Sequence, residues 1–161
     1  MHTHAPPKGR AKLIIYKRKR RLELWLDDAC HAAYPVALGF APSGPKQSEG
    51  DGRTPEGTYA ICTRNAQSRF YLSLGISYPN VVDAHKALEQ GRIDQAAFQR
   101  IVLAHRAQRR PPWDTPLGGA IMIHGHGSQK DWTHGCIAVE DETMDVLWAH
   151  ASLGTTVLIF P

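Results

Sequence analysis

The stretch IMIHGHGSQKDWTHGCIAVEDE, residues 121–142, decides the fold and the chemistry predicted for this chain of 161 residues. An apolar run ends on His124, a glycine-rich turn follows, and a second apolar run begins at Cys136. Ile121 and Ile123 alternate with Met122 and His124, which is typical of a β-strand. The stretch therefore predicts two short strands, with His124 ending the first and Cys136 beginning the second.

Similar alternation on both sides predicts a mainly β fold with a few helices. The expected strands are residues 11–16, 21–28, 34–40, 57–63, 69–76, 118–124, 136–139 and 155–161. The expected helices are residues 81–91, 95–110, with Asp94 as N-cap, and 140–154. The elements do not settle into βαβ units, so a β-sandwich or barrel is favoured over a doubly wound parallel sheet.

The chain divides into a flexible leader at residues 1–10 and one domain at residues 11–161. Residues 79–112 are expected to form a helical insertion. Residues 41–57 are rich in glycine, proline and serine and predict a long loop, a feature that is often functional.

Composition excludes several classes of protein. The apolar runs are strand-sized, so neither a membrane span nor a signal-peptide core is predicted. The chain is expected to be a monomer. The net charge is +4, and the basic run at residues 17–21 is interpreted as a solvated hairpin turn, with no nucleic-acid partner. The three cysteines are widely spaced, so at least one thiol is free.

The residues between 124 and 136 favour nucleophilic catalysis. A thiol is a strong nucleophile only as a thiolate, and an imidazole is suited to removing its proton. Neighbouring strands lie ~4.8 Å apart, so His124 and Cys136 can come within reach. The Gly125 carbonyl can orient the imidazole, and the N–H groups of His134, Gly135 and Cys136 can bind an oxyanion.

Two other interpretations remain open. His124, His126, His134 and Cys136 offer ligands that zinc accepts, although their spacing differs from common zinc motifs. A non-catalytic module that binds an anionic polymer through the basic charge of the chain is the other alternative. No cofactor and no metal are predicted.

The motifs resemble those of the L,D-transpeptidase (YkuD-type) catalytic domain. That family carries an H-G dipeptide followed by S/T-H-G-C, here His124-Gly125 and residues 133–136. An upstream G-D-x-x-T-P-x-G-x-Y segment is matched by Gly50-Asp51 and residues 54–59. The resemblance covers residues 11–161 and implies a β-sandwich-like catalytic domain with a helical insertion.

The resemblance also implies a function. Cys136 would attack a diaminopimelate carbonyl in a peptidoglycan stem peptide and displace D-alanine, with His124 as base and Gly125 as its orienting group. The acyl group would then pass to an amine or to water. The cell envelope or periplasm is the implied location, with peptidoglycan stem peptides as partners.

The resemblance implies further contacts and one departure. His134, Thr133, Arg53 and Tyr59 are the implied substrate-binding residues. Many members place arginine or asparagine two residues after the cysteine, where this chain has Ala138. The DWT segment before HGCIAV and the insertion are similar to a subgroup that contains hydrolases. An L,D-carboxypeptidase, endopeptidase or amidase is therefore the alternative to a transpeptidase.

Overall fold

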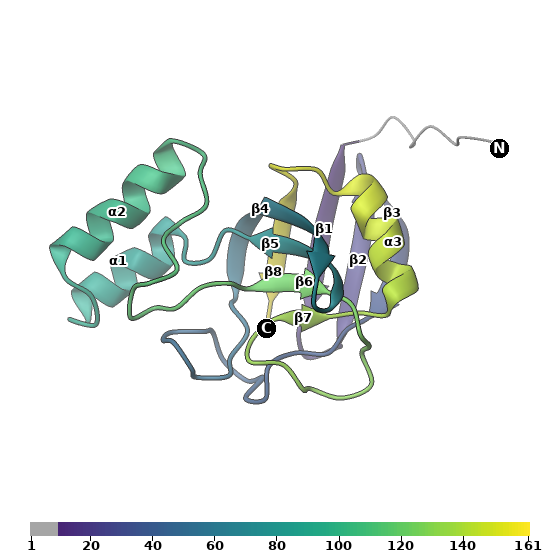
Figure 1. Ribbon diagram of the computed structural model, residues 1–161, viewed down its shortest axis with the longest axis horizontal. Helices are drawn as coiled ribbons and strands as arrows, with labels where there is room; N and C mark the ends of the chain where they lie inside the picture. The colour runs from purple at the N-terminus through teal and green to yellow at the C-terminus, as the bar shows by residue number, and fades with distance from the viewer. Residues whose placement is uncertain (1–9) are drawn as a thin grey trace.

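Eight strands form one curled sheet in the order β3-β2-β1-β8-β4-β5-β6-β7 in the computed structural model, which describes residues 10–161 (Figure 1). The strands are β1 (Ala11–Tyr16), β2 (Arg21–Leu26), β3 (Ala29–Pro35), β4 (Gly57–Ser68), β5 (Tyr71–Ile76), β6 (Met122–His124), β7 (Ile137–Ala138) and β8 (Thr156–Phe160). The mainly β fold expected from the sequence is confirmed. The leader predicted at residues 1–10 lies outside the described residues, except for Arg10.

Strand β4 joins the two halves of the sheet. Its first residues pair antiparallel with β8, which in turn lies parallel to β1. From Ile61 onward β4 pairs with β5, and Figure 1 shows β4, β5 and β6 crossing in front of β1, β2 and β8. The apolar faces of the two halves meet in one core. Its fully buried side chains include Leu13, Ile15, Leu22, Leu24, Leu74, Ile76, Ile123 and Ile137.

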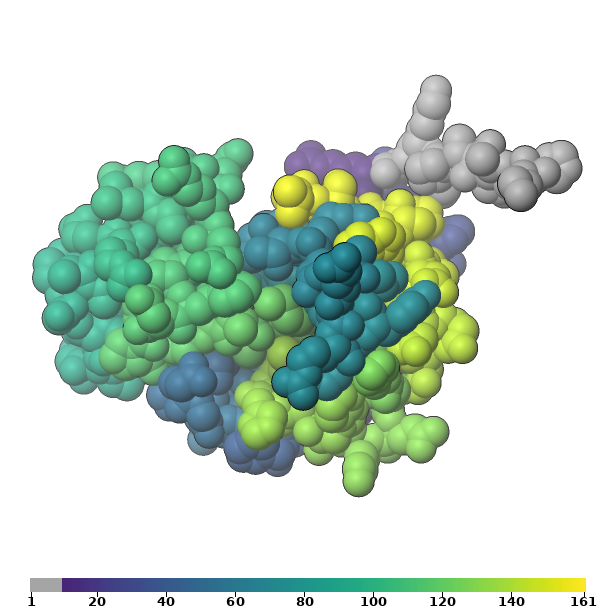
Figure 2. Space-filling model, viewed as in Figure 1, coloured from purple at the N-terminus to yellow at the C-terminus, as the bar shows by residue number. Residues whose placement is uncertain are grey.

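Helix α3 (Asp141–His150) packs on the sheet, whereas α1 (Val81–Glu89) and α2 (Gln95–Arg106) form a separate lobe (Figures 1 and 2). Met144 and Leu147 are the fully buried apolar side chains of α3. The predicted cap of α2 is present, with the Asp94 side chain accepting from Ala97 N–H at 2.8 Å. Both helices of the lobe lie within residues 79–112, the range expected for the insertion.

The strand expected at residues 34–40 is replaced by a different arrangement. Strand β3 ends at Pro35, and the following residues cross to the opposite edge of the sheet. There Ala37 pairs with Ala138 and Gly39 pairs with Thr133 as isolated bridges. Val36, Ala37 and Leu38 are all at most 1% exposed, because the segment is covered on both sides. We call residues 36–40 the strap, since they link the two edges of the sheet.

Two buried lysines hold the long loop at residues 41–57. Lys17 Nζ donates to Gly44 O at 2.8 Å, to Thr54 O at 2.7 Å and to Glu56 Oε2 at 3.0 Å. Burial lowers the pKa of Lys17, although the hydrogen bond with Glu56 opposes this. The second lysine, Lys46, donates to Ser48 O and Asp51 within the loop itself.

The interpretation of the basic run as a solvated turn is therefore wrong for two of its residues. Lys17 is 3% exposed and fastens the loop. Arg20 forms a two-pronged ion pair with Asp131, at 3.0 and 2.7 Å, and Asp131 also accepts from Leu38 N–H. These cations were not recognised in the sequence as structural because their partners lie far along the chain. Across residues 10–161, no helix is both long and apolar enough to cross a membrane.

Replacing Lys17 by methionine should destabilise the fold. The change leaves Glu56 and two carbonyls without their buried donor, and loss of one partner of a buried pair typically costs about 3 kcal/mol or more. Urea unfolding of Lys17→Met measures this, and Arg18→Met, which changes an exposed neighbour in the same run, should stay within about 0.5 kcal/mol of the parent. Equal, small effects of the two variants would show that the buried contacts do not hold the loop.

Candidate active site

His124, the last residue of β6, is buried and has a defined ring orientation. It is 2% exposed, and its Nδ1 lies 2.8 Å from Gly125 O. Because a carbonyl only accepts hydrogen bonds, Nδ1 carries the proton, and Nε2 of the neutral ring is left as the acceptor. Burial lowers the pKa of His124, which keeps the imidazole neutral. This is the contact that the sequence predicted for Gly125.

Two aromatic side chains enclose the His124 ring. Phe70 stacks on it with a centroid separation of 4.4 Å, and Trp132 meets it edge-on at 5.5 Å. The backbone of Phe70 also takes part, since its carbonyl accepts from Gly125 N–H at 2.8 Å. The contact of Phe70 with His124 was not identified from the sequence, because Phe70 comes from the turn between β4 and β5, far along the chain. Trp132 was noted only as part of the DWT segment, without a contact to His124.

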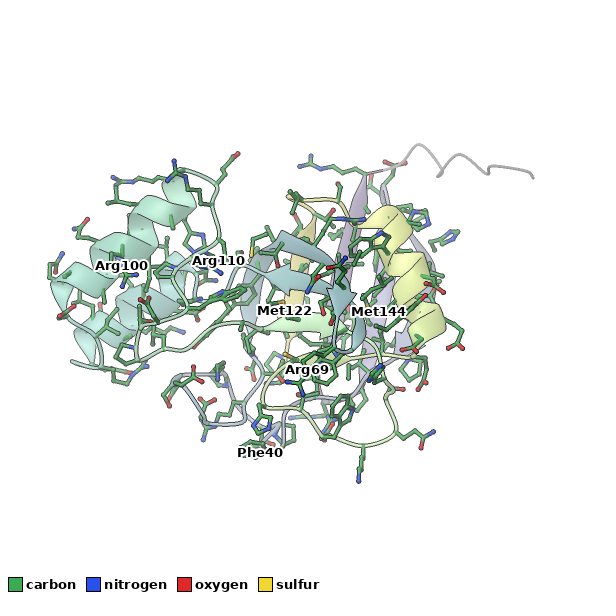
Figure 3. The ribbon with its side chains drawn as sticks, viewed as in Figure 1. Phe40, Arg69, Arg100, Arg110, Met122 and Met144 are labelled. Carbon is green, nitrogen blue, oxygen red and sulfur yellow. The ribbon has the colours of Figure 1, made fainter. Side chains whose placement is uncertain are left out.

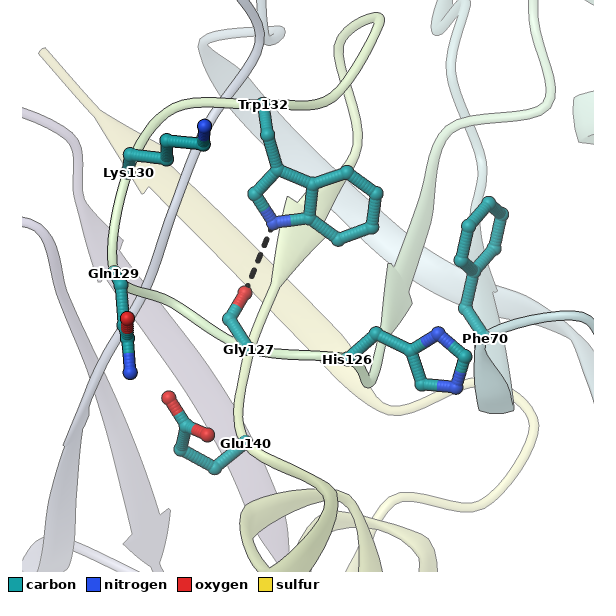
Figure 4. A pocket seen from close by; sticks show the side chains of 7 residues that line it. All are labelled: Phe70, His126, Gly127, Gln129, Lys130, Trp132 and Glu140. Carbon is teal, nitrogen blue, oxygen red and sulfur yellow. Dashed lines mark hydrogen bonds between the residues drawn. The ribbon is translucent and has the colours of Figure 1, made fainter.

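Phe70 and Trp132 also form the walls of an open pocket of about 520 Å³ (Figure 4). Trp132 Nε1 donates to Gly127 O at 3.0 Å, which fixes the indole against the loop that follows His124. Glu140 lines the other side and accepts from Ser128 N–H and Oγ. The pocket is therefore preformed, and only its aromatic wall separates it from the imidazole.

Cys136 directly precedes β7 and lies beside β6. The two strands are parallel, with Ile123 opposite Ile137 and His124 opposite Ala138, so Cys136 comes opposite Met122. Met122 N–H donates to Sγ at 3.4 Å, which agrees with this register. Residues two apart on a strand share a face, so Cys136 and His124 belong to the face opposite the core residues Ile123 and Ile137.

The Cys136 thiol is half-buried, and its surroundings favour the protonated form. Its S–H points to Ala120 O, with Sγ 3.6 Å from that oxygen, and the sulfur makes no hydrogen bond to His124 in the described structure. Burial raises the pKa of Cys136, although the Met122 N–H and the charge of Lys46 act against this. The Cys136 thiol and the His124 imidazole therefore both favour their neutral forms.

The turn at residues 133–136 is held by Thr133. This side chain is 4% exposed, donates to Cys136 O at 2.7 Å and accepts from Gly135 N–H at 3.1 Å. The Gly135 N–H is thus occupied and does not fit the oxyanion role predicted for it. The N–H groups of His134 and Cys136 have no such acceptor within residues 10–161.

The predicted substrate-binding residues lie in different surroundings. Thr133 is inside the turn, and Tyr59 is 3% exposed with its hydroxyl donating to Asp83 at 2.8 Å, so both support the structure from within. The backbone of Arg53 lies against the motif, so closely that a Cβ on Gly135 would be only 2.7 Å from Arg53 O. His134 is exposed, and its ring meets Phe40 edge-on at 5.7 Å.

The sequence did not predict that Phe40 lies beside the motif at residues 133–136. It is 56% exposed, unusual for a large apolar side chain, and it projects at the lower edge of the molecule in Figure 3. Its alternation with Val36 and Leu38 predicted a buried strand residue. Phe40 and His134 instead form an exposed aromatic rim beside the turn.

The four residues of the zinc hypothesis point to different surroundings. His126 is exposed and lies edge-on to Phe70, whereas His134 contacts Phe40 and His124 is enclosed by aromatic rings. Within residues 10–161, no three His, Cys, Asp or Glu side chains are grouped as a metal ion would require.

Comparison with known proteins identifies relatives. "Putative L,D-transpeptidase YafK" of Escherichia coli (strain K12) is 31% identical over 75 residues, which cover 43% of this chain and 30% of YafK. Bd1075 of Bdellovibrio bacteriovorus superposes with a TM-score of 0.62 at 20% identity, over 94% of this chain and 48% of Bd1075. The helical cell shape determining protein Pgp2 of Campylobacter jejuni gives a TM-score of 0.62 at 21% identity, over 95% and 48% of the two chains.

The structural likenesses confirm the fold, and the chain spans about half the length of these two solved proteins. The family model described as the L,D-transpeptidase catalytic domain matches residues 10–159, a range that contains the His124-Gly125 and residue 133–136 motifs. The resemblance inferred from those motifs is thereby confirmed: the chain belongs to the YkuD family of L,D-transpeptidase catalytic domains.

Proposed function

We propose that this domain transfers the acyl group of a peptidoglycan stem peptide through a thioester on Cys136. The observation that supports it best is the buried His124 imidazole, held by Gly125 O so that Nε2 accepts a proton, on the same strand face as the half-buried thiol. Burial, a fixed tautomer and a neighbouring thiol are what a cysteine acyl-transfer site requires.

The reaction would run in two halves. Sγ bonds to the diaminopimelate carbonyl carbon while its proton passes to His124 Nε2, and the negative oxygen is held by the N–H groups of His134 and Cys136. The C–N bond then breaks, and His124 returns the proton to the leaving amine of D-alanine. An amine or a water molecule attacks the thioester next, giving a cross-link or a trimmed peptide.

The thiol must leave Ala120 before this attack. Its S–H donates to Ala120 O in the free protein, so rotation about the Cα–Cβ bond of Cys136 is needed to carry Sγ toward Nε2. Contacts of this kind often reach productive geometry only when substrate is bound. A proposed site of action at the cell wall, in the cell envelope, follows from the substrate.

Incubation with muropeptides that contain diaminopimelate tests the reaction. We expect the loss of D-alanine and a thioester on Cys136, seen by mass spectrometry of the quenched protein. Cross-linked dimers would identify a transpeptidase, whereas trimmed monomers alone would identify a carboxypeptidase. Cleavage of an existing cross-link would identify an endopeptidase.

Cys136→Ala is the matched control, and Cys30→Ala changes an exposed thiol outside the site. Activity should be abolished in the first variant and unchanged in the second. Neither product nor acyl-enzyme in the parent protein under reducing conditions would refute the proposal.

The pH dependence of thiol alkylation is a second test. Because burial raises the pKa of Cys136 above its ordinary 9.0, the thiolate forms only at high pH, and the iodoacetamide rate at this residue should still rise beyond pH 9. Peptide mapping separates Cys136 from Cys62, whose pKa burial raises to about 11. A rate that levels off below pH 8 would instead show a thiolate–imidazolium pair already formed in the free protein.

The acid side of the activity profile tests His124. Burial lowers its pKa below the ordinary 6.5, so the ring stays deprotonated, and the enzyme active, to below pH 6.5. In His124→Gln the rate of Cys136 acylation should fall at least about 100-fold, the usual range for a lost general base. Circular dichroism must show a folded variant, because removal of this enclosed ring also affects packing. Retained acylation by a folded His124→Gln would exclude His124 as the base.

A further inference from the structure

A second cavity, of about 290 Å³, lies between loop 41–57 and the helical lobe. We call it the insertion pocket. The residues that matter here are Lys46 and Glu56 from the loop, Asp83 and Lys86 from α1, Arg92 just after α1, and Leu117. Figure 2 shows the loop, in blue, directly below the green lobe. The pocket therefore exists only because the insertion is present.

Lys46 places a buried positive charge in the wall of this pocket. Its side chain is 3% exposed, and Nζ donates to Ser48 O at 3.0 Å and to Asp51 at 2.9 Å. An ammonium has three N–H donors, and the third has no partner among residues 10–161. A buried donor left without a partner is costly, so a ligand that accepts this hydrogen bond would be stabilised.

The two carboxylates in the lining are already occupied by the protein. Glu56 accepts from the buried Lys17 at 3.0 Å. Asp83 accepts from Tyr59 OH at 2.8 Å and from Asn80 N–H at 3.0 Å, and burial raises its pKa. Neither carboxylate forms an ion pair with Lys46, Lys86 or Arg92 among the described residues, although the charge of Lys86 acts to lower the pKa of Asp83 against the effect of burial.

The remaining cations are available to a ligand. The Lys86 side chain is exposed and makes no hydrogen bond or ion pair with any residue from 10 to 161. Arg92 uses Nε on Gln90 and Nη1 on Gln47 O, which leaves donors free on its guanidinium. Lys46, Lys86 and Arg92 thus present unsatisfied donors around one cavity, an arrangement suited to an anion with several acceptor oxygens.

The insertion pocket is also close to the nucleophile. Leu117 lines it and lies three residues before Ala120, whose carbonyl accepts the Cys136 thiol. Lys46 is near enough for its charge to favour the Cys136 thiolate.

We propose that the insertion pocket is a carboxylate-binding subsite that holds a free carboxylate of the peptide substrate. The cations of the helical lobe and the loop then select peptides with an unmodified carboxylate over amidated ones. The identity of the peptide as a peptidoglycan stem rests on the proposed function, whereas the preference for a carboxylate rests on the pocket itself.

Peptide binding to the Cys136→Ala protein tests the subsite without requiring turnover. The probes are the tetrapeptide L-Ala-γ-D-Glu-diaminopimelate-D-Ala as free acid and versions amidated at one carboxylate at a time, with affinities from calorimetry or NMR titration. We expect amidation of one particular carboxylate to weaken binding about tenfold, as loss of a charge-assisted contact does.

Lys86→Gln identifies where that carboxylate binds. The exposed Lys86 side chain makes no hydrogen bond or ion pair within residues 10–161, so its removal should leave the fold intact. It should weaken binding of the free acid several-fold, with no effect on the peptide amidated at the critical carboxylate. Arg106→Gln, on the exposed end of α2, removes the same charge from the same lobe outside the pocket and should change neither affinity. Equal affinity for all peptides, or equal losses in Lys86→Gln and Arg106→Gln, would overturn the proposal.

The subsite and the reaction can fail separately. Selective binding through Lys86 without any turnover by the parent protein would keep the subsite and refute the proposed acyl transfer. Turnover of amidated and free peptides with equal KM, and no effect of Lys86→Gln, would keep the reaction and refute the subsite.

Discussion

Three backbone segments approach one another so closely at Gly39, Gly52 and Gly135 that side chains cannot fit between them. A Cβ on Gly39 would overlap Gly52 O and lie 2.9 Å from Gly135 Cα. Gly135 has φ +135°, which disfavours other residues. The strap, the long loop and the turn before Cys136 are thereby packed into one unit. The position of Cys136 depends on this contact more than on β7, which has only two residues.

The surroundings of His124 and Cys136 disfavour charge on either side chain. The low pKa of His124 and the high pKa of Cys136 have the same cause, removal from water without a strong counter-charge. In the proposed reaction, the cost of ionising the thiol would be met only when a carbonyl is present to be attacked. Such a cysteine is a poor target for adventitious oxidants and alkylating agents, which react with the thiolate.

Local patterns in the sequence were sufficient for most of the strands and for the residues of the motif. Alternation located β1, β2, β5 and β8 closely, and Asp94 marked the start of α2 through a cap that involves only near neighbours. The Gly125 contact was likewise predictable, because it joins adjacent residues. Contacts between distant parts of the chain could not be predicted from these local patterns. Lys17 appeared to belong to a surface turn, since its acceptors are contributed by residues 44–56.

In the candidate site too, contacts between residues far apart in the sequence could not be predicted. The parallel pairing of β6 with β7 depends on the whole topology of the sheet and leaves no local mark in the sequence. Phe70 could not be associated with His124 by spacing, and the hydroxyl of Thr133 can bind either a substrate or its own turn. For Thr133 the packing decides, because Gly39 of the strap pairs with it and its side chain is almost fully buried.

The lobe of α1 and α2 begins and ends at neighbouring points of the sheet, where Ile76 N–H donates to Ile121 O at 2.9 Å. In topological terms it is one enlarged hairpin loop between the antiparallel strands β5 and β6. The entropy of closing such a loop grows only with the logarithm of its length. Evolution can therefore lengthen, shorten or exchange this lobe while the strand that carries His124 keeps its register.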